Sequence, residues 1–224
     1  YVFNYTPGQI YWCAADIGWV TGQSYVVYGP LANGATTLMF EGVPTWPDAG
    51  RFWAVCDKHK VNQFYTAPTA IRALMGQGPE WVEKYDLSSL RALFLAGEPL
   101  DEPTAQWISH GLGKPIIDNY WQTETGWAIA ANPLGIEELP VKLGSPSVPM
   151  PGYDVQVLDE GGHPVSPGTL GAIAVKLPLP PGTLPTLWNA EERFLKSYLT
   201  QFPGYYETGD AGYVDADGYL YIMA

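Results

Sequence analysis

The sequence has few cysteines, few basic residues and no long apolar run, and each shortage excludes a class of protein. The only two cysteines, Cys13 and Cys56, form no Cys-x-x-Cys motif, so neither a metal knuckle nor a redox pair is predicted. The 11 Lys and Arg residues form no cluster that could neutralise a phosphate backbone. No apolar run approaches the roughly 20 residues that span a bilayer, and residues 1–5 do not resemble a signal peptide. We therefore expect neither a nucleic-acid nor a membrane partner, and a cytoplasmic setting (the mitochondrial matrix in a eukaryote).

The composition is that of a globular chain with a large core. Hydrophobic residues make up 46% of the 224 residues, aromatic residues 14% and charged residues only 15%. This balance argues against disorder and predicts extensive burial. The net charge of −12 is typical of a solvated acidic surface and identifies no substrate by itself.

The hydrophobic pattern changes character along the chain. From about residue 35 to residue 123, segments of strand, loop and helix alternate, which is the signature of parallel βα units. After residue 139, short half-buried strands alternate with turn clusters. We predict an α/β fold: a βα-repeat sheet layer with flanking helices in residues 1–138, followed by a smaller, mostly-β, barrel-like subdomain in residues 139–224.

Individual elements follow from local signals. Strands are predicted at 35–40, 61–65, 90–96 and 115–118, and alternating apolar residues predict half-buried strands at 153–158, 172–175 and 219–223. Helices are predicted from about Ser24, from a cap at Thr45 or Asp48 to Lys58, over 68–75, after a cap at Asp101, and over 190–200. The stretch before Ser24 is expected to form a tightly packed turn, and residues 206–210 a loop.

Several familiar motifs fail on inspection. The nucleophile elbow of α/β-hydrolases has the pattern Gly-x-Ser-x-Gly. In the segment that begins at Gly22, Val26 occupies the position of the last glycine, so a hydrolase is not predicted. The glycines at 111 and 113 precede a strand and not a helix, so dinucleotide binding is excluded. Asp217 and Gly218 are the favoured pair of a hairpin turn, which is preferred over a calcium loop. The three histidines are too scattered to suggest a site.

Three segments carry residue types that suit a nucleotide. They are Leu95-Ala96-Gly97-Glu98-Pro99, Asn119-Tyr120-Trp121-Gln122-Thr123-Glu124-Thr125-Gly126 and Tyr206-Glu207-Thr208-Gly209-Asp210. Aromatic faces can stack on a purine, and a glycine permits close backbone approach. A carboxylate can accept hydrogen bonds from ribose hydroxyls or help hold the Mg²⁺ that accompanies ATP.

These segments resemble motifs of the adenylate-forming acyl-CoA synthetases, over nearly the whole chain. Asp16-Ile17-Gly18-Trp19-Val20-Thr21-Gly22, Tyr28-Gly29-Pro30-Leu31 and Asp118-Asn119-Tyr120-Trp121 are similar to the short-chain branch, the acetyl-CoA and propionyl-CoA synthetases. The resemblance implies a two-step ligase that uses a small carboxylic acid, ATP, Mg²⁺ and coenzyme A. A carboxylate attacks the α-phosphate of ATP to give an acyl-adenylate, and the CoA thiol then displaces AMP.

The resemblance also implies roles for individual residues. Gly97, Glu98, Pro99, Asp118, Tyr120, Gln122, Thr123 and Asp210 would bind the nucleotide. Within this set, Asp118 and Tyr120 would bracket adenine, Asp210 would bind ribose, and Thr123 would touch the α-phosphate. Thr123 and Glu124 are the expected catalytic residues, and Glu124 the metal ligand. Val20, Thr21, Ala96 and Trp121 would form the acyl pocket.

Two further expectations concern the acid and the extent of the chain. Acetate enzymes share the tryptophan at Trp121 but usually carry valine at the position of Ala96, so the extra room here favours propionate over acetate. The phosphate loop and the C-terminal domain with its catalytic lysine are expected to lie outside these residues, which predicts little ligase activity for this chain alone. The alternative is a carbohydrate-binding or glycoside-cleaving domain, because nine Trp, fifteen Tyr and excess carboxylates can build a sugar-stacking surface.

Overall fold

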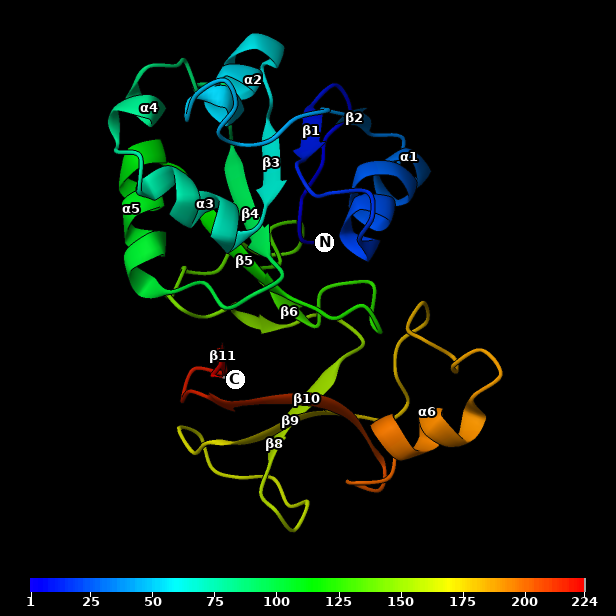
Figure 1. Cartoon of the computed structure of the whole chain (residues 1–224). Coiled ribbons are helices and arrows are strands. Elements are labelled where there is room, and N and C mark those ends of the chain that lie inside the picture. Colours follow the sequence, from blue (N-terminus) through cyan, green and yellow to red (C-terminus); the bar gives the residue numbers. More distant parts are fainter. Residues whose placement is uncertain (224) are drawn as a thin grey trace.

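The computed structural model describes residues 1–223 and contains two β-sheets, one above the other in Figure 1. The larger sheet has the strand order β2-β1-β3-β4-β5-β6-β7. Its strands are β1 Ile10–Cys13, β2 Thr36–Leu38, β3 Gln63–Thr66, β4 Ala92–Ala96, β5 Ile116–Tyr120, β6 Ala130–Ala131 and β7 Val148–Pro149. Strands β1 to β5 pair in parallel, and β6 and β7 add an antiparallel edge. The expected α/β fold with parallel βα units is confirmed.

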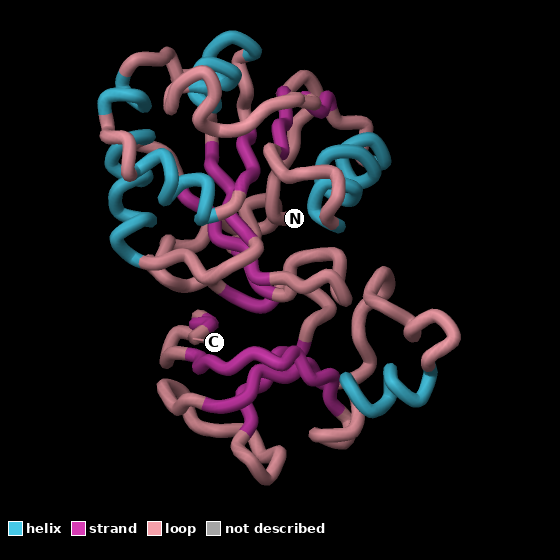
Figure 2. Tube along the Cα trace, viewed as in Figure 1, coloured by secondary structure: helices cyan, strands magenta, loops and turns pink. Residues whose placement is uncertain are grey.

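The strands of this sheet contribute side chains to two hydrophobic cores, one on each face, because successive side chains of a strand point to opposite faces. Trp12, Phe64 and Leu95 belong to the core that includes residues of α2 to α5. Tyr65 and Phe94 belong to the opposite core, which includes residues of the N-terminal helical segment. These helices are η1 Gly22–Tyr28, α1 Gly29–Ala32, α2 Arg51–His59, α3 Pro68–Met75, α4 Glu80–Glu83 and α5 Glu102–Leu112. Figures 1 and 2 show α2 to α5 gathered on one side of the sheet and α1 on the other.

The observed helix boundaries can be compared with the N-caps predicted from the sequence. Helix α5 begins after Asp101, whose carboxylate accepts a hydrogen bond from the backbone N–H of Thr104 at 2.9 Å, so this predicted cap is confirmed. The predicted start of the helix ending near Lys58 is wrong, since α2 begins only at Arg51. Asp48 instead accepts a hydrogen bond from the N–H of Gly50 at 2.9 Å in the turn before that helix.

The N-terminal region departs further from the sequence prediction. Strand β1 was not predicted, because both of its faces are buried and the side chains from Tyr11 to Cys13 therefore show no polar alternation. The helix expected from about Ser24 already begins with η1 at Gly22, and its first stretch is a π-helix. The tightly packed turn expected before it is reduced to residues 17–18.

The second sheet is antiparallel, with the order β11-β10-β9-β8. Its elements are β8 Asp154–Leu158, β9 Gly171–Lys176, helix α6 Glu191–Tyr198, β10 Tyr205–Val214 and β11 Leu220–Ile222. Residues 215–218 join β10 to β11, as the predicted hairpin turn requires. Residues 206–210, expected to be a loop, lie inside β10. Since β7 still belongs to the larger sheet, the second sheet starts at Asp154, and the division at residue 138 stays a prediction.

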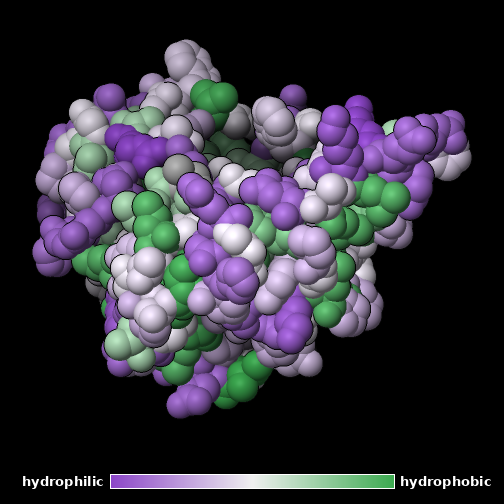
Figure 3. Space-filling view, turned by 90° about the horizontal axis from the view of Figure 1, so that it is seen from below, coloured by the Kyte–Doolittle hydropathy of each residue, from purple (hydrophilic) through white to green (hydrophobic). Residues whose placement is uncertain are grey.

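Seen from the side of the second sheet, the molecule mixes hydrophilic and hydrophobic residues (Figure 3). Within residues 1–223, no helix has both the length and the apolar character that a membrane crossing requires.

Candidate functional site

A cleft of about 220 Å³ lies where the larger sheet meets the second one. The carboxyl ends of the parallel strands β4 and β5 form one side, and β10 and β11 supply Asp210 and Ile222 on the other. This is the edge at which open α/β sheets place ligands. The structure brings eight of the sequence-predicted site residues to this cleft: Gly97, Glu98, Pro99, Asp118, Tyr120, Trp121, Gln122 and Asp210.

The β4–β5 pair sets the floor of the cleft. Register places Leu95 opposite Asp118 and Ala96 opposite Asn119, so the ends of the two strands are level. The amide of Asn119 is buried and lies within hydrogen-bond distance of the carbonyls of Leu95 (3.3 Å) and Ile117 (3.0 Å), which fixes this edge. Although part of Asp118 faces the cleft, burial raises the pKa of its carboxyl to about 7, and a hydrogen bond from the backbone of Asn119 opposes the rise. A ligand group that donates a hydrogen bond there would favour the ionised form.

The loop after β5 is held rigid by a buried hydroxyl. Thr125, 2% exposed, accepts a hydrogen bond from the N–H of Gln122 at 3.1 Å and lies within 3.1 Å of its carbonyl oxygen. Gly126 closes the turn with φ 63°, a conformation that glycine adopts without the Cβ penalty of other residues. Glu124 and Thr123 therefore project from a turn of fixed shape, with Thr123 exposed and Glu124 half-buried.

Strand β10 presents Asp210 through an irregularity. Its pairing with β9 shifts register between Glu207 and Ala211, and Gly209 within the bulge has φ 78°. A bulge bends a strand and re-aims a side chain. The Thr208 hydroxyl accepts a hydrogen bond from the N–H of Asp210 at 3.1 Å and donates to the carbonyl of Ile173 at 2.6 Å, which anchors the bulge to β9. The residues that looked like a loop in the sequence are thus a strand shaped to place one carboxylate.

A hydrogen-bond network joins the two sides of the cleft. Asp210 Oδ2 accepts from the Tyr120 hydroxyl at 2.6 Å and from Gln122 Nε2 at 2.7 Å. The same amide of Gln122 donates to the carbonyl of Thr208 (2.7 Å), and its oxygen accepts from the Tyr206 hydroxyl (2.9 Å). Burial, with a further contribution from Asp210, raises the pKa of Tyr120, so its hydroxyl remains a donor. Asp210 Oδ1 has no hydrogen-bond partner among residues 1–223, which leaves one carboxylate oxygen for a ligand.

Glu124 is tied to the second sheet and its helix. Its carboxylate accepts a hydrogen bond from the Tyr198 hydroxyl at the end of α6 (2.8 Å), and its carbonyl accepts from the N–H of Leu184 (2.8 Å). Tyr198 in turn stacks on Tyr206, with ring centroids 5.6 Å apart. Glu124 is therefore held through both its side chain and its backbone.

Arg72 fixes the loop after β4. Its guanidinium pairs with Glu98 at 2.5 Å and with Asp101, the cap of α5, at 2.9 Å. The second oxygen of Glu98 accepts from the backbone N–H of Thr69 at the start of α3. Glu98 therefore connects the cleft to two helices, and Gly97, with φ 104°, gives the loop its sharp exit from the strand.

The expected acyl-pocket residues are less closely gathered than the nucleotide residues. Trp121 lines the cleft, and Ala96 is buried at the end of β4, where it pairs in register with Asn119. Val20 and Thr21 stand at the start of the helical segment η1, half-buried and outside the cleft lining. The same helix carries Tyr25, whose ring centroid is 4.9 Å from that of Trp121, so the two parts share an aromatic cluster.

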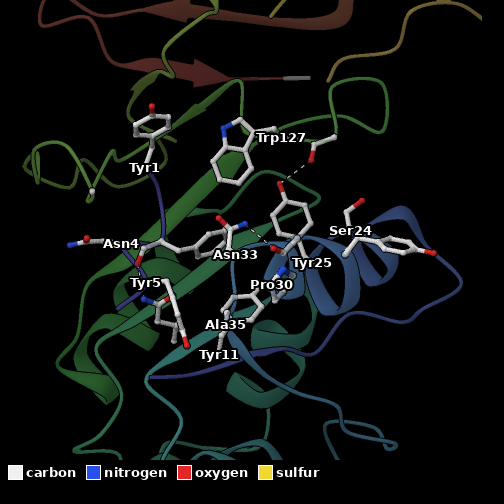
Figure 4. Close-up of a pocket in the computed structure, with 16 residues that line it drawn as sticks. Tyr1, Asn4, Tyr5, Tyr11, Ser24, Tyr25, Pro30, Asn33, Ala35 and Trp127 are labelled. Carbon is white, nitrogen blue, oxygen red and sulfur yellow. Dashed lines mark hydrogen bonds between the residues drawn. The ribbon is translucent and has the colours of Figure 1, made fainter. Parts of the chain in front are cut away.

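A second and larger hollow, of about 660 Å³, lies beside the N-terminal segment. Figure 4 shows Tyr1, Tyr25, Asn33 and Trp127 around it, with the Tyr25 hydroxyl donating to the carbonyl of Gly126. None of its lining residues in the described part of the chain is charged. We favour the smaller cleft as the functional site, because charged and hydrogen-bonding groups from several elements converge there.

Comparison with known proteins shows which family the chain belongs to. The model of the family described as AMP-binding enzyme matches residues 1–182. The chain belongs to the AMP-binding enzyme family. It is 54% identical to an acetyl-coenzyme A synthetase of Rhodobacter capsulatus and 50% identical to a propionate–CoA ligase of Escherichia coli, in each case over 99% of this chain. A crystal structure of an acyl-CoA synthetase from Brucella canis superposes with a TM-score of 0.86 at 34% identity, covering all of this chain. The motif-based resemblance to the short-chain synthetases is thereby confirmed.

The matched region is only part of those proteins. The chain spans 34% of the R. capsulatus relative, 36% of the E. coli relative and 39% of the B. canis chain. It therefore corresponds to about a third of the length of an AMP-binding enzyme of this kind. The family membership gives no support to the carbohydrate alternative.

The carboxylates of the chain determine whether a metal would fit near the cleft. Within residues 1–223, no three His, Cys, Asp or Glu side chains come together to hold a metal. Mg²⁺ commonly keeps several waters and binds through one or two carboxylates together with substrate phosphates. The half-buried carboxylate of Glu124 would fit a metal that is held mainly by substrate phosphates.

Sequence reasoning missed several residues that shape this site. Tyr65, Tyr198 and Tyr206 supply hydroxyls that hold Trp121, Glu124 and Gln122. Each contacts a residue at least 56 positions away, so no local pattern could have revealed it. Only Thr125 carried a usable signal, since threonine three residues after a turn's start commonly bonds back to the backbone.

Proposed function

We propose that this chain is the acid- and nucleotide-recognising part of an AMP-forming ligase that joins a short-chain carboxylic acid to coenzyme A. A carboxylate oxygen of the acid attacks the α-phosphorus of ATP and diphosphate leaves, giving an acyl-adenylate. The CoA thiol then attacks the acyl carbonyl and AMP leaves. The support is the family membership together with the convergence of charged groups on the cleft.

The observation that carries the proposal is the arrangement around Asp210. Two donors from the loop after β5, Tyr120 and Gln122, hold one of its oxygens, and the other oxygen is without a protein partner among the described residues. A carboxylate fixed in this way is pre-organised to accept hydrogen bonds from the vicinal hydroxyls of ribose, because little side-chain entropy remains to be lost. Asp118 and Tyr120 would then flank the adenine, with Gly97, Glu98 and Pro99 along its edge.

The first chemical step requires positioning and charge neutralisation more than proton transfer. A carboxylic acid is already ionised at pH 7, so no general base is needed. Thr123 would donate its hydroxyl hydrogen to the α-phosphate, and Glu124 would help place Mg²⁺, which neutralises phosphate charge when bound. Tyr198 would keep the Glu124 carboxylate oriented toward that region.

We propose propionate as the preferred acid, over acetate. Trp121 would close the acyl pocket, and Ala96 leaves more room beside it than the valine usual in acetate enzymes. One additional methylene in such a pocket is worth roughly 1 to 3 kcal/mol, or 10- to 200-fold in discrimination. Val20 and Thr21 would form the remaining wall.

The proposal covers the whole protein and not the 224-residue chain by itself. Because the chain spans about a third of its relatives, we expect the chain alone to have little or no ligase activity. The free, buried thiols of Cys13 and Cys56 support a reducing setting such as the cytoplasm, or the mitochondrial matrix in a eukaryote.

The test is a comparison of acids by the whole protein that contains this chain. Release of AMP and formation of the acyl-CoA are measured with ATP, Mg²⁺ and CoA, using propionate and acetate in parallel. We expect kcat/KM to be about tenfold or more higher for propionate. A clear preference for acetate would contradict the choice of acid, and activity with neither acid would contradict the proposed ligase.

A further inference from the structure

Three aromatic side chains from separate elements meet behind the cleft. Tyr25 comes from η1, Tyr65 from β3 and Trp121 from the loop after β5. The ring centroid of Tyr25 lies 5.0 Å from that of Tyr65 and 4.9 Å from that of Trp121. The indole N–H of Trp121 donates a hydrogen bond to the Tyr65 hydroxyl at 2.9 Å, which closes the triangle.

Tyr65 is the fixed member of this group. Strand β3 lies between β1 and β4 in the middle of the larger sheet, where Tyr65 pairs in register with Cys13 and Phe94 and is 1% exposed. Burial raises the pKa of its hydroxyl, which therefore stays neutral. Trp121 stands on irregular backbone at the cleft and is only half-buried. The hydrogen bond thus connects a loop residue to a central strand whose residues are all buried.

We propose that Tyr65 is a positioning residue that sets acid specificity, because its hydrogen bond fixes the orientation of the Trp121 indole and so the depth of the acyl pocket. The inference rests on the proposed function. A side chain that ends a pocket excludes a longer substrate only if it cannot turn aside, so an anchor outside the pocket is as important as the ring itself. Tyr25 packs against the indole but offers it no hydrogen bond, so Tyr65 determines the direction of the N–H.

The experiment uses Tyr65→Phe in the whole protein, because this change removes the hydroxyl and keeps the ring. Adenylation kinetics are measured with propionate and with butyrate, together with the KM for ATP. We expect the propionate-to-butyrate ratio of kcat/KM to fall about tenfold, which is the lower end of the discrimination that one methylene group produces in a hydrophobic pocket. The KM for ATP should stay within about twofold, since Tyr65 does not line the nucleotide part of the cleft.

Tyr11→Phe is the matched control. Tyr11 lies on the neighbouring strand β1 in the same core, is 5% exposed, and its hydroxyl has no hydrogen-bond partner within the described part of the chain. Losing this hydroxyl should leave the acid ratio unchanged. Thermal unfolding of both variants, compared with the unmodified protein, verifies that each is folded.

A second test asks whether the hydroxyl acts through the indole. Trp121→Phe removes the N–H from the other partner, so adding Tyr65→Phe to that variant should change the acid ratio no further. An unchanged ratio in folded Tyr65→Phe would overturn the inference, as would an equal effect of Tyr65→Phe in both backgrounds. Should the whole protein adenylate none of the acids, the proposed function fails and this inference with it. Adenylation with an unaltered ratio refutes the role of Tyr65 alone.

Discussion

The two sides of the cleft hold their polar groups by different means. On the sheet side, Asp118 and Tyr120 extend from β5, a strand paired on both edges and packed against two cores. On the β10 side, Asp210 lies within a bulge of a half-exposed strand, and its orientation depends on hydrogen bonds from Tyr120 and Gln122. The first side is positioned by packing, and the second is positioned by the first. Changes at Asp210 should therefore affect binding, whereas changes at Asp118 should affect folding as well.

The largest effect is expected from Asp210→Ala. The substitution removes the carboxylate that would accept two hydrogen bonds from ribose and leaves the Tyr120 and Gln122 donors without their acceptor. Hydrogen bonds to a charged group are worth about 1.5 to 3 kcal/mol each, so AMP affinity of the whole protein should fall about 100-fold or more. Isothermal titration calorimetry measures this change directly.

The control for this prediction is Asp217→Ala. Asp217 lies in the turn that joins β10 to β11, and it pairs with Lys142 at an exposed position outside the cleft. Its replacement should leave AMP affinity unaltered. Equal losses in the two variants would mean that Asp210 acts only through the overall charge.

On the sheet side, the stability of the fold should depend on pH through Asp118. Burial raises the folded-state pKa of Asp118 to about 7, above the usual unfolded value of about 3.9. Stability associated with the protonated form is complete below pH 4 and is lost as the pH rises through 7. Asp118→Asn, which stays neutral, should therefore match the unmodified chain near pH 4 and exceed it at pH 8 by on the order of 2 to 4 kcal/mol.

Urea unfolding of the 224-residue chain at the two pH values measures this difference. Asp154→Asn provides the comparison, since it makes the same side-chain change at an exposed position on β8. If Asp118→Asn were equally stabilising at both pH values, burial of the charge would not be the cause.

The smallest effect is expected from Tyr206→Phe. Its hydroxyl donates to the amide oxygen of Gln122 at 2.9 Å, and Gln122 in turn holds Asp210. Loss of one neutral hydrogen bond, worth about 1 kcal/mol, should weaken AMP binding by about three- to tenfold. The same titration measures it, and an effect as large as that of Asp210→Ala would contradict the order of dependence described above.

The sequence predicted the sheet side of the cleft better than the β10 side. The apolar runs in β3 to β5, the Asp101 cap and the segments around Glu98 and Gln122 carried local signals, so the parallel sheet and its edge were accessible. Strand β10 was mistaken for a loop because Thr208-Gly209-Asp210 has the composition of a turn, although its neighbours continue the pairing. Strand β1 was not predicted because both of its faces are buried, so its sequence shows no polar alternation. The tyrosine hydroxyls that complete the site come from distant segments, and only the folded chain brings them together.

The most direct test of the account is exchange of labelled diphosphate into ATP, catalysed by the whole protein that contains this chain. This reaction reports formation of the acyl-adenylate without requiring CoA. We predict exchange that depends on added propionate, is weaker with acetate, and is lost in Asp210→Ala at ATP concentrations that saturate the unmodified protein. Exchange that proceeds without any acid, or that is unaffected by Asp210→Ala, would contradict the assignment of this cleft as the site of adenylation.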